Sequence, residues 1–366
     1  MAPEFVSAPS PTMGRAGAGG NPCQGLWHAP SGRPRAAFVA THYEVDFSEH
    51  YLAAPLAERG YGFLGWNTRY RGVGHYFCLE QAVVDIGVGV RWLREVAGVD
   101  TVILLGNSGG ASLMSAYQSQ ALEPNLTPSP GSYLPDAALS LPAADLFVSL
   151  NAHPGRPDVL TAWLDPSVTD ESDPLSVDAG LDMYDRAHGP PYDEGFVARY
   201  RRAQQERNHR ITAWCHDQLE RLAAAVTYDR IFPVFRTWAD LRFLDLAIDP
   251  SDRPVGCYFG DPAVANRTPF GLAASNTVRS WLSMWSLTDS QCRAEPHLAR
   301  VTQPSLVVQS TGDQGCYPSD ARAIHAALAA PDKTLEMIAG DHYLQQPAGA
   351  RQAAADLIAG WADSRC

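Results

Sequence analysis

Short apolar runs alternate with amphipathic stretches along the first part of the chain. Runs of five or six apolar residues predict buried strands, whereas apolar positions three or four residues apart predict helices that cover one face of a sheet. Strands and helices that alternate at this spacing predict an α/β fold with a mostly parallel sheet between two layers of helices. The expected elements are a strand at 36–41, a helix at 49–59, a strand at 61–66, a helix at 79–96, a strand at 101–105, a helix at 109–120 and a strand at 145–150.

The alternation stops at residues 154–296 and then returns. The intervening segment has an acidic, proline-rich stretch and two stretches with helical spacing, at 196–222 and 275–287. A segment of this length is too long for a structureless loop. We therefore expect an α/β core formed by 23–153 and 297–366, with a mainly helical cap domain inserted at 154–296. The expected elements after the insertion are a strand at 305–309, a helix at 319–330, a strand at 334–338 and a helix at 348–362.

The N-terminal segment, 1–22, is rich in alanine, proline, glycine and serine, which predicts a disordered tail. Its composition leaves open whether 1–12 belong to the native protein. It has no basic region followed by an apolar stretch, so no signal peptide is expected. The seven cysteines are widely spaced and form no C-x-x-C pair. This pattern favours free thiols in a reducing compartment and a cytoplasmic protein.

The net charge of the chain indicates which kinds of molecule it is expected to bind. The formal net charge is −12, without a basic stripe or tail, which argues against binding to nucleic acid. No apolar run is long enough to span a membrane. No H-E-x-x-H or similar ligand spacing is present, so neither a metal nor another cofactor is expected. We expect a small-molecule substrate, and the sequence leaves a homo-oligomer open.

A single serine, Ser108, lies between small residues at the junction of a predicted strand and a predicted helix. The stretch 106–110 reads Gly-Asn-Ser-Gly-Gly. In a G-x-S-x-G turn of this kind the serine is held in a strained backbone conformation. Its hydroxyl projects above the sheet edge, and the next backbone N–H points toward the same space. The pattern therefore predicts a displayed nucleophile.

A serine hydroxyl needs a base, and the base needs an orienting acid. Asp313 and His342 each follow the end of a later predicted strand. Carboxyl ends of parallel strands meet at one edge of the sheet, so we expect Asp313 and His342 to lie near Ser108. Asp289 and Asp341 are the rival candidates for the acid.

The order Ser108, Asp313, His342 resembles that of the α/β-hydrolases. The resemblance covers 26–153 and 298–365, and the insertion resembles the cap domain of that family. It implies a nucleophile, an acid and a base in that order, with the backbone N–H of Gly109 in the oxyanion hole.

The loop after the first predicted strand departs from the usual family pattern, because His42 is not followed by glycine in ATHYEVDF. This loop and the later GYGFLGWNTRYRG are similar to the cocaine-esterase and X-prolyl dipeptidyl-peptidase branch. That similarity implies that the Tyr43 hydroxyl helps Gly109 to hold the oxyanion. The Glu44 backbone N–H is the alternative donor.

The expected function is that of a carboxylesterase, a serine hydrolase that cleaves a small to medium apolar or aromatic ester through an acyl-enzyme. Amide, lactone or β-diketone carbon–carbon hydrolysis on the same triad stays open, as does a catalytically silent binding protein. Arg69 and Arg71 follow a predicted strand and lie within reach of an anionic substrate group. Further residues expected to line the pocket are His42, Glu44, Asn107, His153, Trp281 and Trp285.

Overall fold

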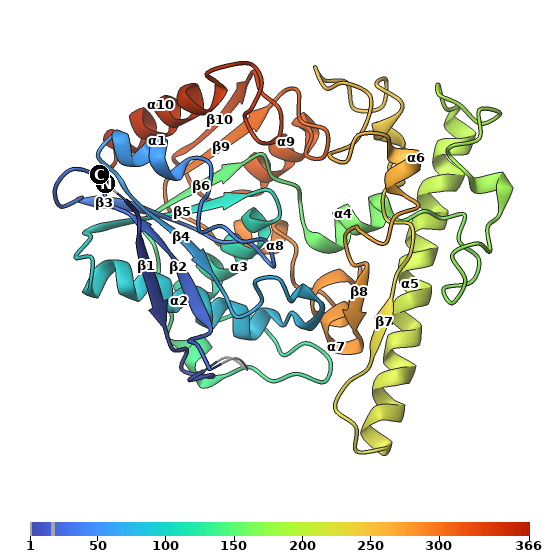
Figure 1. Ribbon diagram of the computed structural model, residues 1–366, viewed down its shortest axis with the longest axis horizontal. Helices are drawn as coiled ribbons and strands as arrows, with labels where there is room; N and C mark the ends of the chain where they lie inside the picture. The colour runs from blue at the N-terminus through green and yellow to red at the C-terminus, as the bar shows by residue number, and fades with distance from the viewer. Residues whose placement is uncertain (1, 16–18) are drawn as a thin grey trace.

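The computed structural model describes residues 2–15 and 19–366. Within these residues a mixed eight-stranded sheet has the order β1-β2-β4-β3-β5-β6-β9-β10 (Figure 1). Its strands from β3 onward pair in parallel, and β1 and β2 add an antiparallel edge. The sheet strands are β1 (Glu4–Ala8), β2 (Cys23–His28), β3 (Ala36–Ala40), β4 (Gly62–Asn67), β5 (Thr101–Asn107), β6 (Leu146–Leu150), β9 (Ser305–Ser310) and β10 (Lys333–Ile338).

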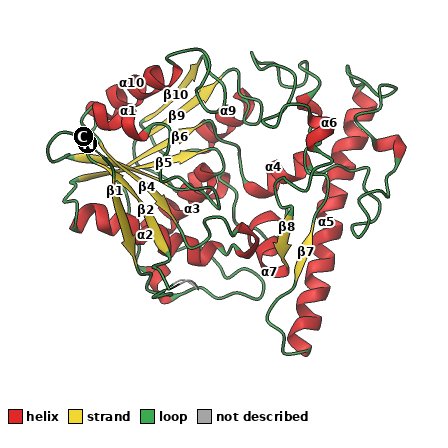
Figure 2. Ribbon diagram, viewed as in Figure 1, coloured by secondary structure: helices red, strands yellow, loops and turns green. Residues whose placement is uncertain are grey.

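Helices cover both faces of this sheet (Figure 2). One apolar layer packs α1 and α10 against the sheet, and the other packs α2, α3 and α9 against the opposite face. Every residue of β3, β4, β6 and β9 is buried, as expected for strands that lie between two layers of helices. The core helices are α1 (Ala53–Glu58), α2 (Leu79–Glu95), α3 (Gly110–Leu122), α8 (Glu295–Leu298), α9 (Pro318–Ala327) and α10 (Ala350–Asp363).

The N-terminal segment differs from the prediction of a disordered tail. Residues 4–8 form β1, which pairs antiparallel with β2 at the edge of the sheet. Val6 is buried within the core that contains Trp27. Pairing with the β2 edge and burial of Val6 order this part of the segment, which composition could not reveal. Residues 1 and 16–18 of the predicted tail lie outside the described residues.

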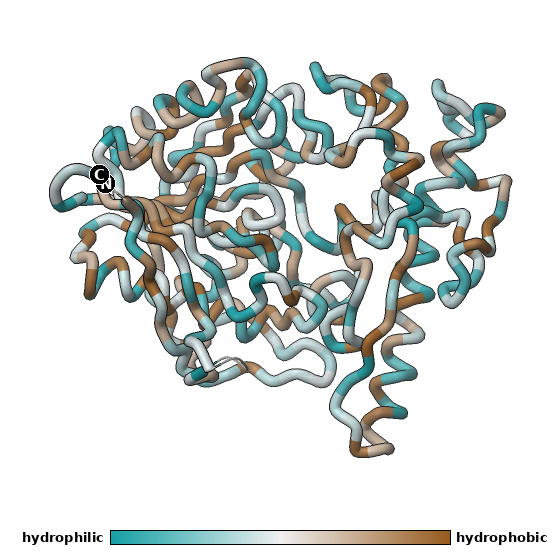
Figure 3. The backbone as a smooth tube through the Cα atoms, in the orientation of Figure 1, coloured by the Kyte–Doolittle hydropathy of each residue, from teal (hydrophilic) through white to brown (hydrophobic). Residues whose placement is uncertain are grey.

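Most of the segment between β6 and β9 lies to one side of the sheet and contains the longest helix, whereas α8, near its end, packs against α3 and α9 of the core (Figure 1). That helix, α5, is mostly hydrophilic and buries only one face, which includes Phe196, Tyr200 and Ile211 (Figure 3). Among the described residues, no helix is both long and apolar enough to cross a membrane. The elements of the segment are α4 (Arg156–Trp163), α5 (Glu194–Ala224), β7 (Ile231–Pro233), α6 (Pro262–Ala265), β8 (Ser275–Thr277) and α7 (Val278–Ser280), followed by a π-helical turn, Trp281–Trp285.

The helix expected at 275–287 is only partly correct. Its first residues form β8, which pairs antiparallel with β7. Thr277 then caps α7, because its side chain accepts the backbone N–H of Ser280. The apolar residues of 275–287 have the spacing of a helix, which is why a helix was predicted. The first three residues instead pair with β7, a strand more than 40 residues earlier in the chain, and the sequence did not indicate this pairing.

Candidate active site

Ser108 lies on a sharp turn between β5 and α3. Its φ is +55°, a left-handed conformation that is strained for a residue other than glycine. A Cβ atom at Gly106 would lie 2.4 Å from the Cα of Ala111, and one at Gly110 would lie 2.4 Å from the carbonyl oxygen of Thr41. Both glycines are therefore required by close backbone approach. Ser108 is partly exposed within buried surroundings, as the sequence pattern predicts.

Asp313 and His342 form a buried pair. Asp313 follows β9, and its Oδ1 accepts the backbone N–H groups of Gly315 and Cys316 at 2.8 and 3.0 Å. Its Oδ2 lies 2.7 Å from Nδ1 of His342, which follows β10. Because a carboxylate only accepts hydrogen bonds, Nδ1 is the donor, and Nε2 of the neutral imidazole is left as the basic nitrogen.

Hydrogen bonds tie the strand ends that carry these residues. The Ser108 N–H donates to the Leu150 carbonyl at the end of β6. The next residue, Asn151, donates from Nδ2 to the His342 carbonyl at 3.1 Å. Within the described residues the Ser108 hydroxyl forms no hydrogen bond to His342. Nucleophile–base hydrogen bonds often tighten only in the reacting complex.

Asp289 and Asp341, the other candidates for the acid, contact residues other than the His342 imidazole. Asp289 contacts the exposed His216 at 3.1 Å and accepts the Ser286 hydroxyl. Asp341 accepts the backbone N–H groups of the loop that follows it, including those of Tyr343 and Gln345. Asp313 is therefore the carboxylate that contacts the imidazole of His342.

Tyr258, from the segment between β6 and β9, also contacts this pair, although the sequence did not predict it. Its hydroxyl donates to Asp313 Oδ1 at 3.2 Å and lies 3.1 Å from His342 Nδ1. Burial, followed by the charge of Asp313, raises the pKa of Tyr258, so the hydroxyl stays protonated and can donate. A tyrosine in a loop, 55 residues before the aspartate that it contacts, carries no sequence signal of this role.

A group of potential metal ligands overlaps the pair. Asp313, Cys316 and His342 each place a ligand atom within 4.8 Å of the others. Burial, followed by the charge of Asp313, raises the pKa of the Cys316 thiol, and a protonated thiol is a poor ligand. The short bond from Asp313 to His342 also occupies the groups that a metal would need. The donor set fits a hydrogen-bonded acid–base pair better than a metal site.

The Tyr43 hydroxyl has a different contact from the one that the resemblance implied. It lies 3.0 Å from Ser112 Oγ in the buried core. Ser112 itself donates to the Gly109 carbonyl at 3.1 Å, so Tyr43 must donate to Ser112. The hydroxyl proton is therefore committed to a chain of bonds that supports the Ser108 turn. This geometry does not support the prediction that Tyr43 donates to an oxyanion.

His42 and Asn107 support the turn from either side. The Nδ1 of His42 accepts the Val45 N–H, so its Nε2 carries the proton, and a Cβ atom at Gly109 would lie 3.0 Å from that nitrogen. Asn107 is buried, donates to the Leu150 carbonyl at 2.9 Å and accepts from His50. Asn107 is therefore a framework residue and does not line an open pocket.

The expected pocket tryptophans differ in their surroundings. Trp281 is fully buried and donates to Thr212 Oγ1 at 3.0 Å, within the apolar core. Trp285 is also buried, but with Glu44 it lines a cavity of about 130 Å³.

Arg69 and Arg71 are bound to other carboxylates. Arg69 forms a bidentate, buried pair with Asp85, at 2.8 and 2.7 Å. Arg71 lies 3.4 Å from Asp46. Arg69 is therefore not free to serve an anionic substrate group, whereas the Arg71 side chain is 40% exposed and its pair with Asp46 is weak.

Arg156, the first residue of α4, is buried beside Gly109 and was not expected at the site from the sequence. His153, three residues earlier, is buried too, and its Nδ1 has no hydrogen bond in the described part of the chain. The signal available in the sequence was the position of Arg156 shortly after a strand end, in SLNAHPGRP.

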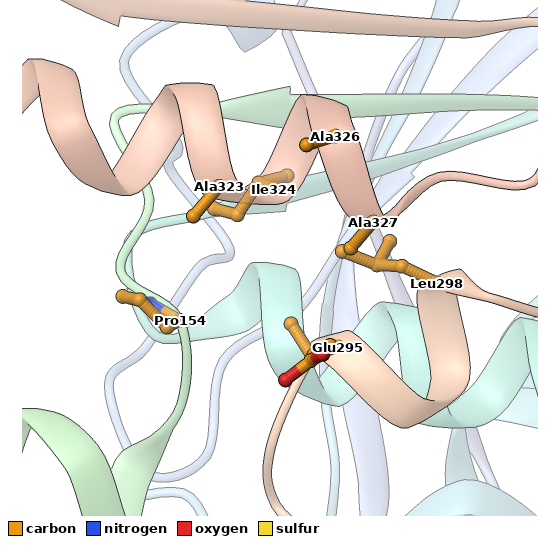
Figure 4. Close-up of a pocket in the computed structure, with 8 residues that line it drawn as sticks. Pro154, Glu295, Leu298, Ala323, Ile324, Ala326 and Ala327 are labelled. Carbon is orange, nitrogen blue, oxygen red and sulfur yellow. The ribbon is translucent and has the colours of Figure 1, made fainter.

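A separate cavity of about 430 Å³ lies between α8 and α9 (Figure 4). Its lining is mostly apolar and includes Leu298, Ile324 and Ala327, with Glu295 at one side. Neither Ser108 nor the Asp313–His342 pair lines it. The size of this cavity therefore does not indicate where the chemistry takes place.

Buried neutral histidines should make the fold sensitive to acid. Burial lowers the pKa of His50 to about 4, and burial followed by Arg156 lowers those of His42 and His153. The unfolded chain therefore binds more protons below pH 6.5. Each of these histidines should lower the free energy of unfolding by about 1.4 kcal/mol per pH unit as the pH falls toward 4. Urea denaturation at pH 7, 6 and 5 measures this slope.

The control for this prediction is a histidine on the surface. His50→Gln should reduce the slope, whereas replacement of the exposed His209 by Asn should leave it unchanged. A free energy of unfolding that stays constant between pH 7 and 5 would contradict the prediction.

No protein-family model and no curated protein sequence matches this chain. Its structure is similar to that of the α/β hydrolase GrgF from Penicillium sp. sh18, with a TM-score of 0.55, 13% identity, and coverage of 100% of this chain and 99% of the other. It is also similar to a soluble variant of monoglyceride lipase from Saccharomyces cerevisiae, with a TM-score of 0.52, 12% identity, and coverage of 100% and 95%. The sheet order, the flanking helices and these similarities show that the chain has the α/β-hydrolase fold.

Proposed function

We propose that the protein is a serine hydrolase that cleaves carboxylic esters through an acyl-enzyme on Ser108. The observation that carries the proposal is the 2.7 Å contact between Asp313 and His342, at strand ends tied to the one that displays Ser108. The monoglyceride lipase from Saccharomyces cerevisiae, which has the same fold, agrees with it.

In the proposed reaction, His342 Nε2 takes the proton of the Ser108 hydroxyl while its oxygen attacks the ester carbonyl. Asp313 holds the imidazole through Nδ1 and stabilises the imidazolium. The tetrahedral intermediate collapses, and His342 returns the proton to the departing alcohol. His342 then activates a water molecule, which attacks the acyl-enzyme and releases the acid.

We assign the oxyanion to backbone donors. The Gly109 N–H follows the nucleophile and is the first donor. The second is the N–H of Glu44, since the Tyr43 hydroxyl is committed to Ser112. One such donor stabilises the transition state by about 3–4 kcal/mol.

Hydrolysis of an amide, a lactone or a β-diketone would use the same three residues. These reactions differ from ester hydrolysis in the bond that is cleaved and the group that leaves. Rates on matched ester, amide and β-diketone substrates measure this preference. A preference for the carbon–carbon bond would replace the ester assignment.

Labelling with a fluorophosphonate, followed by peptide mapping in the mass spectrometer, tests the proposal. A single adduct on Ser108 is expected, together with a burst of alcohol from a chromogenic ester. A protein that neither labels at Ser108 nor hydrolyses any ester would be a silent scaffold, and the proposal would be rejected.

Tyr258 is proposed as a positioning residue for the acid–base pair. Tyr258→Phe removes the hydroxyl that donates to Asp313 and keeps the ring, whose centroid lies 4.6 Å from that of His342. A hydrogen bond to a charged group is worth about 1.5–3 kcal/mol, so kcat should fall about tenfold or more while KM changes little. Steady-state kinetics with a chromogenic ester measure both constants.

The neighbouring Tyr343 offers a matched control for this variant. Its ring lies 5.9 Å from that of Tyr258, and it is partly exposed. Tyr343→Phe should leave kcat unchanged. If Tyr258→Phe changed kcat as little as Tyr343→Phe does, the Tyr258 hydroxyl would have no positioning role, and the residue would act through the packing of its ring alone.

A further inference from the structure

The guanidinium of Arg156 is buried beside the turn that carries Ser108. The residue is 2% exposed. A Cβ atom on Gly109 would lie 3.1 Å from the Arg156 Cζ and 3.2 Å from its Nε. The absence of a side chain at 109 therefore makes room for the guanidinium next to the backbone N–H that we assign to the oxyanion.

Two nitrogens of this guanidinium, Nε and Nη2, are buried and have no hydrogen bond in the part of the chain that the structure describes. A carboxylate oxygen of Glu44 lies 3.7 Å from Nη2, which is too long for a hydrogen bond. The rings of Tyr43 and Trp285 face the guanidinium, with centroids 4.5 and 5.1 Å from Cζ. These contacts stabilise a cation but satisfy none of its in-plane N–H donors.

The fully buried Arg207 offers a comparison, because both donors on the Nε–Nη2 edge of its guanidinium form hydrogen bonds. Its Nε and Nη2 donate to the two carboxylate oxygens of Glu171 at 2.9 and 2.7 Å. The remaining donors of Arg207 bind backbone carbonyls. Because a buried charge without hydrogen bonds destabilises a fold, the open edge of Arg156 indicates a partner that is not part of this chain.

The surroundings of Arg156 favour an anion. The neighbouring His42 and His153 are buried, and Arg156 further lowers their pKa, so they add no charge of either sign. The Glu44 side chain is 35% exposed and lines the cavity of about 130 Å³ together with Trp285. Arg156 does not itself line this cavity, but its contacts Glu44 and Trp285 do, so a small carboxylate reaches the guanidinium from the cavity only when the Glu44 carboxylate moves away.

We propose that the Nε–Nη2 edge of Arg156 binds a carboxylate of the substrate, which takes the place of Glu44. Arginine binds carboxylates through two parallel N–H···O bonds on one edge. Gly109 lies beside this guanidinium, since a Cβ atom at 109 would be 3.1 Å from Cζ, and it also supplies the proposed oxyanion N–H. The carboxylate would therefore lie only a few bonds from the scissile carbonyl. The inference rests on the proposed ester hydrolysis and names its substrate class: half-esters of short dicarboxylic acids.

Half-esters and their neutral carboxamide counterparts test the proposal. Monomethyl malonate, succinate and glutarate are compared with the corresponding methyl ester amides by titration of the acid released. At least one half-ester should have a kcat/KM about 30-fold or more above that of its amide. Arg156→Met should abolish this preference, because kcat/KM should fall about 30-fold further for the half-ester than for its amide. Glu44→Gln should lower KM for the half-ester, because a competing carboxylate is removed.

A binding measurement separates this inference from the proposed chemistry. In Ser108→Ala, quenching of tryptophan fluorescence, to which Trp285 contributes, reports the Kd of each half-ester and amide. Tighter binding of the half-ester by about 30-fold, lost when Arg156→Met is added, supports the carboxylate site even without turnover. Thermal unfolding confirms that each variant is folded.

Two results would overturn the carboxylate site. One is that the protein without the Arg156→Met substitution has equal kcat/KM values for half-ester and amide, and that Ser108→Ala binds both with equal Kd. The other is an equal loss of turnover on both substrates in Arg156→Met, which would assign Arg156 to the oxyanion instead. Failure of Ser108 to label would reject the proposed hydrolysis and leave the binding result to decide the role of Arg156.

Discussion

Replacement of Ser108 by alanine is expected to lower kcat on a chromogenic ester by about 10⁵- to 10⁶-fold. The variant loses the nucleophile, and the remaining groups then act without a covalent intermediate. What persists is the contribution of the oxyanion donors and of substrate binding, about 10³- to 10⁴-fold over water. Single-turnover kinetics with the purified variant measure this residual rate, and the acyl-enzyme burst should be absent.

A buried serine on the following helix provides the control. The Ser115 hydroxyl donates to the Ser112 carbonyl at 2.8 Å, and Ser115→Ala removes an equal volume without touching the proposed chemistry. Its kcat should stay within a few-fold of the unaltered protein. If Ser108→Ala kept most of its activity, another nucleophile would have to be sought.

The backbone strain at Ser108 adds a second readout. Ser108→Gly should also abolish turnover, but its free energy of unfolding should rise by about 1 kcal/mol, because glycine adopts a φ of +55° without steric cost. Opposite changes in activity and stability are expected where a fold holds a nucleophile in a strained position. Urea denaturation of Ser108→Gly and Ser108→Ala compares the two effects.

Replacement of Asp313 by asparagine is the second large effect. Asparagine keeps the size of the side chain but removes the charge that faces His342 Nδ1. An amide N–H directed at this nitrogen favours the tautomer with the proton on Nε2, which cannot accept the serine proton. We therefore expect kcat to fall by about 10⁴-fold. Rates of ester turnover and of fluorophosphonate labelling should fall together.

Asp289→Asn is the matched control, since this rival acid contacts the exposed His216 instead. Its effect on kcat should be small. The assignment would be wrong if turnover fell strongly in Asp289→Asn and stayed near normal in Asp313→Asn. Asp289 would then be the acid, and it would have to contact His342 in the reacting protein.

Most of the α/β core could be predicted from the sequence because its signals are local. Buried strands between two helical layers need continuous apolar runs, and β3, β5, β6 and β9 have them. The turn at Ser108 needs small residues where strand and helix approach closely, and Gly106 and Gly110 meet that need. The narrower similarity of the 40–47 loop to the cocaine-esterase branch stays a prediction.

The edge strands and the insertion were harder to predict because their order depends on distant partners. β1 is largely exposed and is ordered by pairing with β2. β7 and β8 are three residues each and pair across more than 40 positions of the chain. Elements this short have too few residues for a hydrophobic period to be recognised. The boundaries of the proposed cap likewise remain a prediction.

By itself the sequence determined the alternation of strands and helices, the strained turn that displays Ser108, and the placement of Asp313 and His342 after strand ends. These properties depend on neighbouring residues and on the rule that parallel strands end at one edge. Only the tertiary structure decided that the Tyr43 hydroxyl donates to Ser112, that Tyr258 contacts the acid–base pair, and that Arg156 is buried with an open edge. Each of these contacts joins segments far apart in the chain, and hydrogen-bond partners at that distance are set by packing.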